Sequence, residues 1–421
     1  MFKLLEKNEM INRKSFFNFF LILITVVIVL VIIYLSLIIG LKNNNLSRLF
    51  KGSDFQLFTN GSDLIINGNK EKLYDIEYYK KLLLDKEIKK VYRPHYTPIL
   101  YYFYIPFAFL PVFWGIFLSS LLFILLYCFS IIIIICTFKR LENLKYLILF
   151  LSMFFPPFFY TILNGHPSVL WLFFLTLGFF FSKKGKPFIS GMILSLLILK
   201  PNFYLLIFII FLFSLQPRLL FGLVTGTIIF VFISGIWDSF YLWKQWLGVF
   251  IDLANNFFEK DTMIHFGQYS KRMFFYPIFS TNKIIIIINY IFVLTGLLAI
   301  ILPCVYSYLN KNQFSRNSFW FIFTISIVLA SPYLYNFDLI ILFLPLTILI
   351  NLMLADRVLN KYIIIMLISF CICVISCFLI NIFFHIQLLV PILWFFLING
   401  TLGKRIRNYT PKTFIQYWED Y

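Results

Sequence analysis

Apolar runs of about 20 residues recur along most of this chain, and they restrict it to a helical membrane fold. Backbone polar groups inside a bilayer must be hydrogen-bonded within the protein, so such runs span as α-helices. Runs such as Ile131–Ile135 and Ile284–Ile288 lack the period-2 alternation of a membrane β-barrel strand. The composition agrees, since 61% of the residues are hydrophobic and 13% are charged. The whole chain, 1–421, is predicted to be one all-α, polytopic transmembrane domain.

The apolar pattern predicts about twelve crossings, within a range of roughly 10–13. They are 17–41, 113–138, 144–163, 167–182, 187–199, 201–215, 218–236, 283–308, 316–332, 336–355, 361–384 and 386–402. The first run is longer than a signal-peptide core and lacks a cleavage site, so it is interpreted as an uncleaved anchor. The stretch 98–112 is interpreted as a re-entrant or interfacial segment.

Basic residues predict the sidedness. With the N-terminus in the cytoplasm, the inner connections hold Lys139, Arg140, Lys145, Lys183, Lys184, Lys186, Arg218, Lys311, Arg316, Arg357, Lys361, Lys404, Arg405 and Arg407. The short outer connections hold one basic residue, Lys200, as the positive-inside rule predicts. Two long extracytoplasmic loops, 42–97 and 237–282, are expected to contain amphipathic helices that lie on the membrane. The sequence therefore predicts a multi-pass inner-membrane protein that acts on the outer face.

The net charge of +18 does not indicate nucleic-acid binding, because the basic residues lie between spans. Membrane lipids are expected partners of the protein. The six cysteines all lie in apolar runs, where a thiol behaves as a small hydrophobe. No metal cluster and no cofactor are predicted.

Two sites in the first long loop contain residues suited to sugar or phosphate chemistry. Asp54 follows the first span closely, and its carboxylate is either a general base or a solvated loop charge. Arg93 precedes Pro94, and His95 lies between Pro94 and Pro98, before an aromatic segment. Arginine suits a phosphate because its planar fork donates two hydrogen bonds. The alternative is a proline-rich entry turn with Arg93 at the lipid head groups.

Two short outer turns contain further candidates. Asn164 and His166 belong to a tight uncharged turn, which needs only Asn and Gly for its geometry. His166 is therefore either a substrate contact or a plain turn residue. A lysine at membrane depth, such as Lys200, is costly and is functional by default, with snorkelling to the surface as the alternative.

The remaining candidates are His265 and Gln268 in the second long loop and Asp338 after a break in an apolar region. His265 and Gln268 offer mixed donors and acceptors, or they form a solvated turn. Asp338 opens a helix, where the macrodipole alone favours an acid. All four histidines of the chain lie on the predicted outer side, together with Asp54, Lys200 and Asp338.

Five motifs occur in an order that resembles a known family. They are Asp54-Phe55 with Gly68 and Leu73-Tyr74-Asp75; Tyr96-Thr97-Pro98 with Pro106 and Pro111; Asn164-Gly165-His166; Gly191 through Lys200-Pro201; and Ser331-Pro332-Tyr333 through Asp338. In this order the motifs resemble those of the GT-C membrane glycosyltransferases, specifically glycosyltransferase family 87. The resemblance covers roughly residues 20–350. His166 stands where the family usually has Gln, and Phe337-Asp338 replaces a His found in some members.

The resemblance implies an inverting, metal-independent transferase. Its donor would be a polyprenyl-phosphate-linked hexose or pentose, as in mannosyltransferases that use polyprenyl-phosphate mannose, and its acceptor a lipid or a glycan. The outer face has no supply of nucleotide sugars, which agrees with a lipid-linked donor. Asp54 would be the general base, with Asp63 and Asp75 as rivals. Arg93, His166 and Lys200 are candidates for the leaving phosphate, and Asp338 for orienting a sugar hydroxyl or a basic neighbour.

Two other function classes compete with a transferase. A transporter or lipid flippase is expected to place polar residues at the midplane of the membrane and often to contain an internal repeat. Neither is evident in this sequence. A non-enzymatic scaffold leaves the polar outer turns without a reason.

Overall fold

The computed structural model describes residues 53–75, 77–78, 81, 94–153, 155–236, 240–255, 282–309, 316–331, 334–355 and 393. Within these ranges every regular element is an α-helix or a short 3-10 helix, as the sequence predicts. The expected spans at 17–41 and 361–384 lie outside the described residues, as does 386–402 apart from residue 393. So do three candidate site residues, Arg93, His265 and Gln268.

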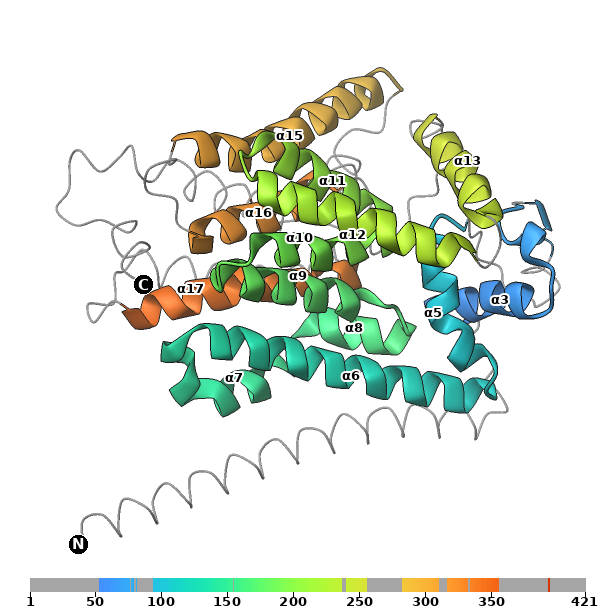
Figure 1. Ribbon diagram of the computed structural model, residues 1–421, viewed down its shortest axis with the longest axis horizontal. Coiled ribbons are helices and arrows are strands. Elements are labelled where there is room, and N and C mark those ends of the chain that lie inside the picture. The colour runs from blue at the N-terminus through green and yellow to red at the C-terminus, as the bar shows by residue number, and fades with distance from the viewer. Residues whose placement is uncertain are drawn as a thin grey trace, which may run out of the picture.

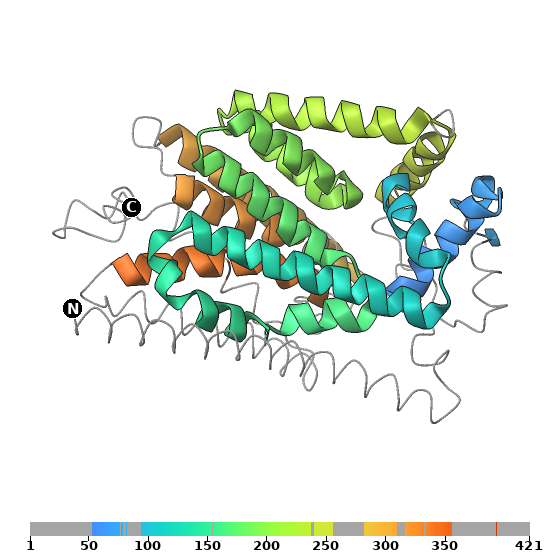
Figure 2. The ribbon, with the colours of Figure 1, turned by 60° about the horizontal axis from the view of Figure 1, so that its bottom comes forward.

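Most of the described helices run alongside one another in a bundle (Figures 1 and 2). They are α6 (Val112–Thr137), α9 (Ser168–Lys183), α10 (Pro187–Leu194), α11 (Pro201–Phe213), α12 (Pro217–Ile236), α15 (Asn282–Leu309), α16 (Arg316–Ala330) and α17 (Phe343–Ala355). Helix α16 is the centre, since every residue from Asn317 to Leu329 is buried. Trp320 of α16 packs on Phe179 of α9 and donates a hydrogen bond to Ser182 Oγ at 3.1 Å.

Three further helices gather at one end of the bundle, on the right in Figures 1 and 2. They are α3 (Asp54–Ile66), α5 (Pro98–Ala108) and α13 (Tyr241–Asn255), with a 3-10 turn, η1 (Lys70–Lys72), after α3. Helix α3 packs against α5, where Ser62 Oγ donates to the Tyr101 carbonyl at 2.7 Å. The buried face of α3 therefore contacts protein, and a position of this loop on the membrane surface stays a prediction.

Prolines divide two of the apolar runs. The expected span 144–163 is two helices, α7 (Lys145–Ser152) and α8 (Pro156–Asn164), after a 3-10 segment, η2 (Lys139–Leu144). Pro156 and Pro157 lack a backbone N–H and restrict the preceding residue, so a single helix cannot continue through them. The stretch 98–112 contains α5, which ends at Ala108, and α6 begins at Val112, after Pro111. A re-entrant or interfacial position for this stretch stays a prediction.

A third break lies between α10 and α11, at the position that the sequence predicts. Helix α10 tightens into the 3-10 segment η3 (Ser195–Leu199), and Pro201 begins α11. Lys200 between them has extended backbone, with φ −122° and ψ 91°. Helices α10 and α12 also approach backbone to backbone, because a Cβ on Gly191 would lie 2.1 Å from the Leu219 carbonyl oxygen.

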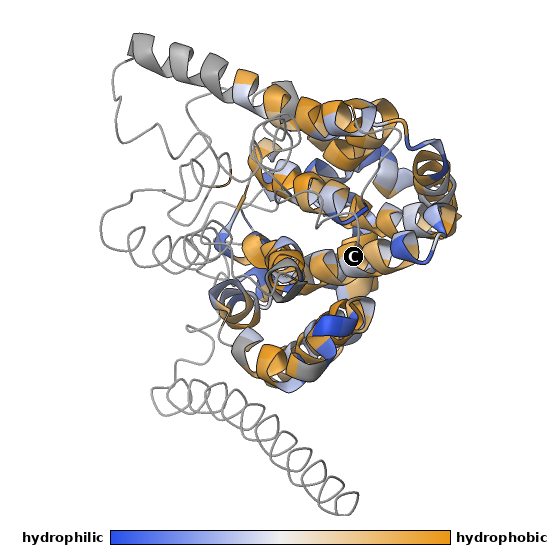
Figure 3. Ribbon diagram, turned by 90° about the vertical axis from the view of Figure 1, so that its left-hand side faces the viewer, coloured by the Kyte–Doolittle hydropathy of each residue, from blue (hydrophilic) through white to orange (hydrophobic). Residues whose placement is uncertain are grey.

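By length and composition, two helices within the described ranges are long and apolar enough to cross a membrane: α6 and α12. Apolar residues (orange) cover much of the described helices in Figure 3. Helix α12 exposes Phe221, Ile228 and Ile236 at 68%, 63% and 60% of their surface, which suits contact with lipid. The shorter apolar helices do not meet the length of a span by themselves, so twelve crossings stay a prediction.

Candidate active site

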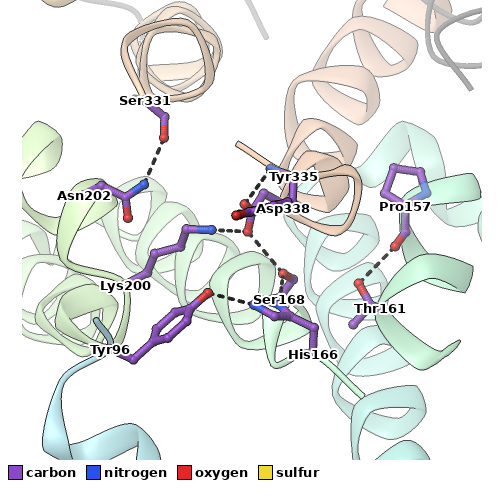
Figure 4. A network of polar contacts seen from close by, with 10 residues as sticks. All are labelled: Tyr96, Pro157, Thr161, His166, Ser168, Lys200, Asn202, Ser331, Tyr335 and Asp338. Carbon is purple, nitrogen blue, oxygen red and sulfur yellow. Dashed lines mark hydrogen bonds and ion pairs between the residues drawn. The ribbon is translucent and has the colours of Figure 1, made fainter. Parts of the chain in front are cut away.

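Four interruptions of the helices bring polar side chains together in the core (Figure 4). Tyr96 comes from the segment before α5, and His166 from the turn between α8 and α9. Lys200 comes from the break before α11, and Asp338 from the 3-10 helix η5 (Asn336–Leu342). These residues are between 0% and 4% exposed. The sequence predicts that His166, Lys200 and Asp338 lie on the same side of the membrane. In the structure these three side chains lie close together.

Lys200 forms an ion pair with Asp338 Oδ1. The extended backbone at Lys200 and the proline after it end the helical hydrogen bonding, which turns this side chain away from its own helix axis. Its ammonium also lies 4.8 Å from the ring centroid of Phe203, one turn into α11. The lysine is therefore paired, and it does not snorkel to a surface.

Asp338 accepts hydrogen bonds in addition to the ion pair. Tyr335 N–H donates to Oδ2 at 3.0 Å, which caps η5, and Ser168 Oγ donates to Oδ1 at 3.3 Å. A fully buried carboxylate is stable only when its charge is compensated in this way. Lys200 and these two donors supply that compensation.

His166 is positioned by the end of α8. Gly165 has φ +61°, a left-handed conformation that suits glycine, and it reverses the chain there. The ring of His166 places Nε2 2.9 Å from the Tyr96 hydroxyl and Nδ1 2.6 Å from Ser168 Oγ. Its face stacks on Phe337, with ring centroids 3.7 Å apart. Both ring nitrogens therefore contact side chains of the protein.

Asp54 is the first residue of α3 and is half-buried. Ser53 caps the helix by accepting from Gln56 N–H at 3.3 Å. Burial, and then the charges of Asp338 and Asp54, raise the pKa of Tyr96 well above its usual value, so this hydroxyl keeps its proton.

Contacts through the neighbours of Asp54 hold it beside the His166 turn. Tyr104 donates to the Gly165 carbonyl at 2.8 Å, and a Cβ on Gly165 would lie 2.5 Å from Phe55 Cβ. The rival acids lie elsewhere. Asp63 is nine residues along α3, a rise of about 13 Å, and Asp75 is exposed and accepts from Tyr78 N–H.

The other described candidates have less direct positions. Asn164 donates to the Tyr160 carbonyl of its own helix at 2.8 Å, which is a helix-end contact. The carbonyl of His95 accepts from Trp246 of α13 at 3.0 Å, and its ring lies 4.4 Å from that of Tyr96. His95 therefore links α13 to the candidate site.

An apolar groove of about 530 Å³ begins next to Lys200. Ile198 and Pro201, on either side of Lys200 in the sequence, line it, together with residues of α11, α12 and α13. The other lining residues are Tyr204, Leu205, Val231, Phe240, Trp243, Lys244, Trp246, Leu247 and Phe250. Its largely apolar lining suits a hydrocarbon chain, and Lys244 contributes a cation to that lining.

The model of glycosyltransferase family 87 matches residues 95–332, more than half of the chain. The chain belongs to glycosyltransferase family 87. The matched region contains Tyr96, His166 and Lys200, while Asp54 and Asp338 lie outside it. Neither the curated proteins nor the solved structures contain a match to this chain.

For a family 87 glycosyltransferase, the arrangement offers a half-buried carboxylate, a buried cation and an apolar groove within one region. Family membership and the apolar helices together indicate a membrane protein. Among the described residues, no group of three or more His, Cys, Asp or Glu side chains is placed to hold a metal ion.

Sequence reasoning did not select Tyr96 as a site residue, nor Ser168. The sequence singles out Tyr96 only as part of a motif shared with the family, and it gives no prediction for Ser168. Ser168 follows His166 by two residues, so its hydroxyl reaches the imidazole. The one sequence feature that could have indicated Ser168 is its position as a polar residue directly after the His166 turn. Its partner Asp338, 170 positions further along the chain, carried no local sign of the contact.

Proposed function

We propose that this glycosyltransferase moves a hexose or pentose from a polyprenyl-phosphate donor to a lipid or glycan acceptor. The reaction would take place on the outer face of the cytoplasmic membrane. The observation that carries the proposal is the position of Lys200, a buried cation paired with Asp338 at the helix break whose flanking residues, Ile198 and Pro201, line an apolar groove.

The groove and the lysine suit the two parts of a lipid phosphate. A groove of about 530 Å³ with apolar and aromatic walls favours a hydrocarbon chain. An ammonium group has three N–H donors, so Lys200 can hold Asp338 and also donate to a phosphate oxygen. Lys244 provides further positive charge along the groove.

Asp54 is the proposed general base. Its carboxylate takes the proton of the acceptor hydroxyl while that oxygen attacks the anomeric carbon of the donor. The bond from the anomeric carbon to the phosphate oxygen breaks, and the polyprenyl phosphate leaves with the electron pair. Attack from the face opposite the phosphate inverts the anomeric configuration. Lys200 interacts with the charge that develops on the leaving oxygen, so the proposed reaction is metal-independent.

The orientation rests on the basic residues. The predicted inner connections are rich in Lys and Arg, and Lys200 is the one basic residue of the short outer connections. In this orientation Asp54, His166, Lys200 and Asp338 all belong to the extracytoplasmic half of a multi-pass inner-membrane protein whose N-terminus is cytoplasmic. A lipid-linked donor is the form in which an activated sugar reaches that face.

Incubation of the purified protein with a panel of polyprenyl-phosphate hexoses and pentoses, and with lipid extracts as acceptors, tests the proposal. We expect transfer from at least one of these donors, with inversion at the anomeric carbon seen by NMR of the product. Nucleotide sugars form the comparison panel. Transfer from nucleotide sugars alone would refute the donor assignment.

A further inference from the structure

A continuous series of polar contacts joins Tyr96 to Lys200 through the core (Figure 4). The Tyr96 hydroxyl lies 2.9 Å from His166 Nε2, and Nδ1 of the same ring lies 2.6 Å from Ser168 Oγ. Ser168 Oγ lies 3.3 Å from Asp338 Oδ1, which pairs with Lys200. The series links the segment before α5, the start of α9, η5 and the start of α11.

The chemistry of the end groups fixes the direction of each hydrogen bond. Asp338 is paired with Lys200, so it is an ionised carboxylate that only accepts. The single hydroxyl hydrogen of Ser168 therefore points to Asp338. Ser168 Oγ must then accept in its contact with His166, which places a hydrogen on Nδ1.

The Tyr96 side of the ring agrees with this assignment. Tyr96 keeps its proton, and a neutral imidazole with a hydrogen on Nδ1 has an acceptor at Nε2. The tyrosine hydroxyl donates to that acceptor over 2.9 Å. A doubly protonated ring would have two donors and would add a second cation to a site that already holds Lys200. Such a charge is unfavourable here, because the His166 side chain is 1% exposed and its ring is stacked on the apolar ring of Phe337.

We propose that His166 is a neutral imidazole, protonated on Nδ1, that acts as a one-way hydrogen-bond bridge from Tyr96 to Ser168. Through Ser168 the bridge orients Asp338, and Asp338 holds Lys200 beside the groove. His166, Ser168 and Tyr96 are then positioning residues. This replaces the expectation that His166 contacts the leaving phosphate, because both of its ring nitrogens face protein side chains.

Nitrogen-15 NMR of histidine-labelled protein in lipid bilayers tests the bridge without any use of activity. The chain has four histidines, and the spectrum of a His166→Gln variant identifies the signals that belong to His166. We expect the protonated nitrogen of this ring to be Nδ1 and the unprotonated one to be Nε2 at pH 7. A ring protonated on Nε2 alone, or on both nitrogens, would overturn the proposal.

The positioning role rests on the proposed transferase function and is tested by turnover. Ser168→Ala is expected to lower kcat about tenfold, since the lost hydrogen bond goes to a charged group. Ser182→Ala is the matched control. It removes a buried serine from the other end of α9, where the side chain accepts from Trp320, and kcat should stay unchanged. The midpoint of thermal unfolding shows that both variants are folded.

The pH profile separates a bridge from an acid or base. With a neutral bridge, His166→Gln and the wild type should have the same pH dependence of kcat, because the glutamine amide also offers N–H donors on one atom and an acceptor on another. Loss of one limb of the profile in His166→Gln would contradict the bridge, as would normal turnover in Ser168→Ala. If the wild type transfers no sugar, the proposed function fails, and the NMR result still decides the state of His166.

Discussion

Lys200 and Asp338 are ion-paired where their side chains are 4% and 0% exposed, so neither charge is compensated by water. The pair joins the break before α11 to η5, two segments that meet only in the folded core. A buried pair is therefore both a part of the site and a constraint on the fold. Any variant that removes one charge leaves the other without compensation.

Lys200→Met tests this relationship first. The change leaves Asp338 buried without its cation, and it should destabilise the protein by about 3–5 kcal/mol. It should also lower kcat or raise the donor KM by at least about tenfold, because the cation beside the groove is lost. Unfolding in detergent and steady-state transfer assays measure the two effects.

The double variant Lys200→Met, Asp338→Leu separates stability from catalysis. Replacing both charges by apolar groups of similar size is often neutral for stability. We expect the double variant to regain most of the lost stability and none of the lost activity. Activity that returned together with stability would mean that Lys200 supports the fold only.

Local sequence features predicted much of the helical arrangement and part of the site. Pro201 after an apolar run predicted a break at Lys200, because proline cannot continue a helix, and the structure has that break. Lys200 is conspicuous in the sequence because a charge at membrane depth needs a partner, and Asp338 because it follows a break in an apolar region. The partner itself could not be predicted, since pairing depends on how distant segments pack.

Other features of the fold depend on tertiary packing or on local helix breaks, which hydropathy does not report. Helix α3 has the composition of a surface helix, yet Ser62 donates to the Tyr101 carbonyl and holds it against α5. The consecutive prolines Pro156 and Pro157 divide the predicted span 144–163 into two helices, and a crossing by this segment stays a prediction. Hydropathy alone carries no information on a break of that kind.

Gly165→Ala should destabilise the protein more than Gly185→Ala does. Both glycines have left-handed backbone, with φ +61° and +74°, which costs a non-glycine residue roughly 1–2 kcal/mol. Only at Gly165 would the new Cβ meet another side chain, Phe55 Cβ at 2.5 Å. The difference between the two unfolding midpoints measures that contact. Equal midpoints would show that α3 does not pack tightly on the His166 turn.

Filling the groove should weaken donor binding. Val231 lines the groove, and Val231→Trp is expected to raise the donor KM about tenfold. Ile228→Trp is the control on the same helix, since Ile228 is 63% exposed and does not line the groove. A donor analogue with a very short prenyl chain should be affected less by Val231→Trp. Equal effects on the long and short donors would place the chain elsewhere.

Single cysteines test the orientation in the membrane. In a chain whose six cysteines are replaced, Asn67→Cys at the exposed end of α3 should react with an impermeant reagent in intact cells. Lys184→Cys lies at an exposed position after the C-terminal end of α9, the end away from His166, and it should react only after lysis. The reverse labelling pattern would show that the protein has the opposite orientation, with the proposed site on the cytoplasmic face.

The turnover of Asp54→Asn tests the central proposal most directly. The change keeps the size of the side chain and removes the base, so transfer from the polyprenyl-phosphate sugar should fall at least about 100-fold. Asp63→Asn, a carboxylate on the same helix about 13 Å further along, should keep near-normal turnover. Near-normal turnover in Asp54→Asn would contradict the account of this site.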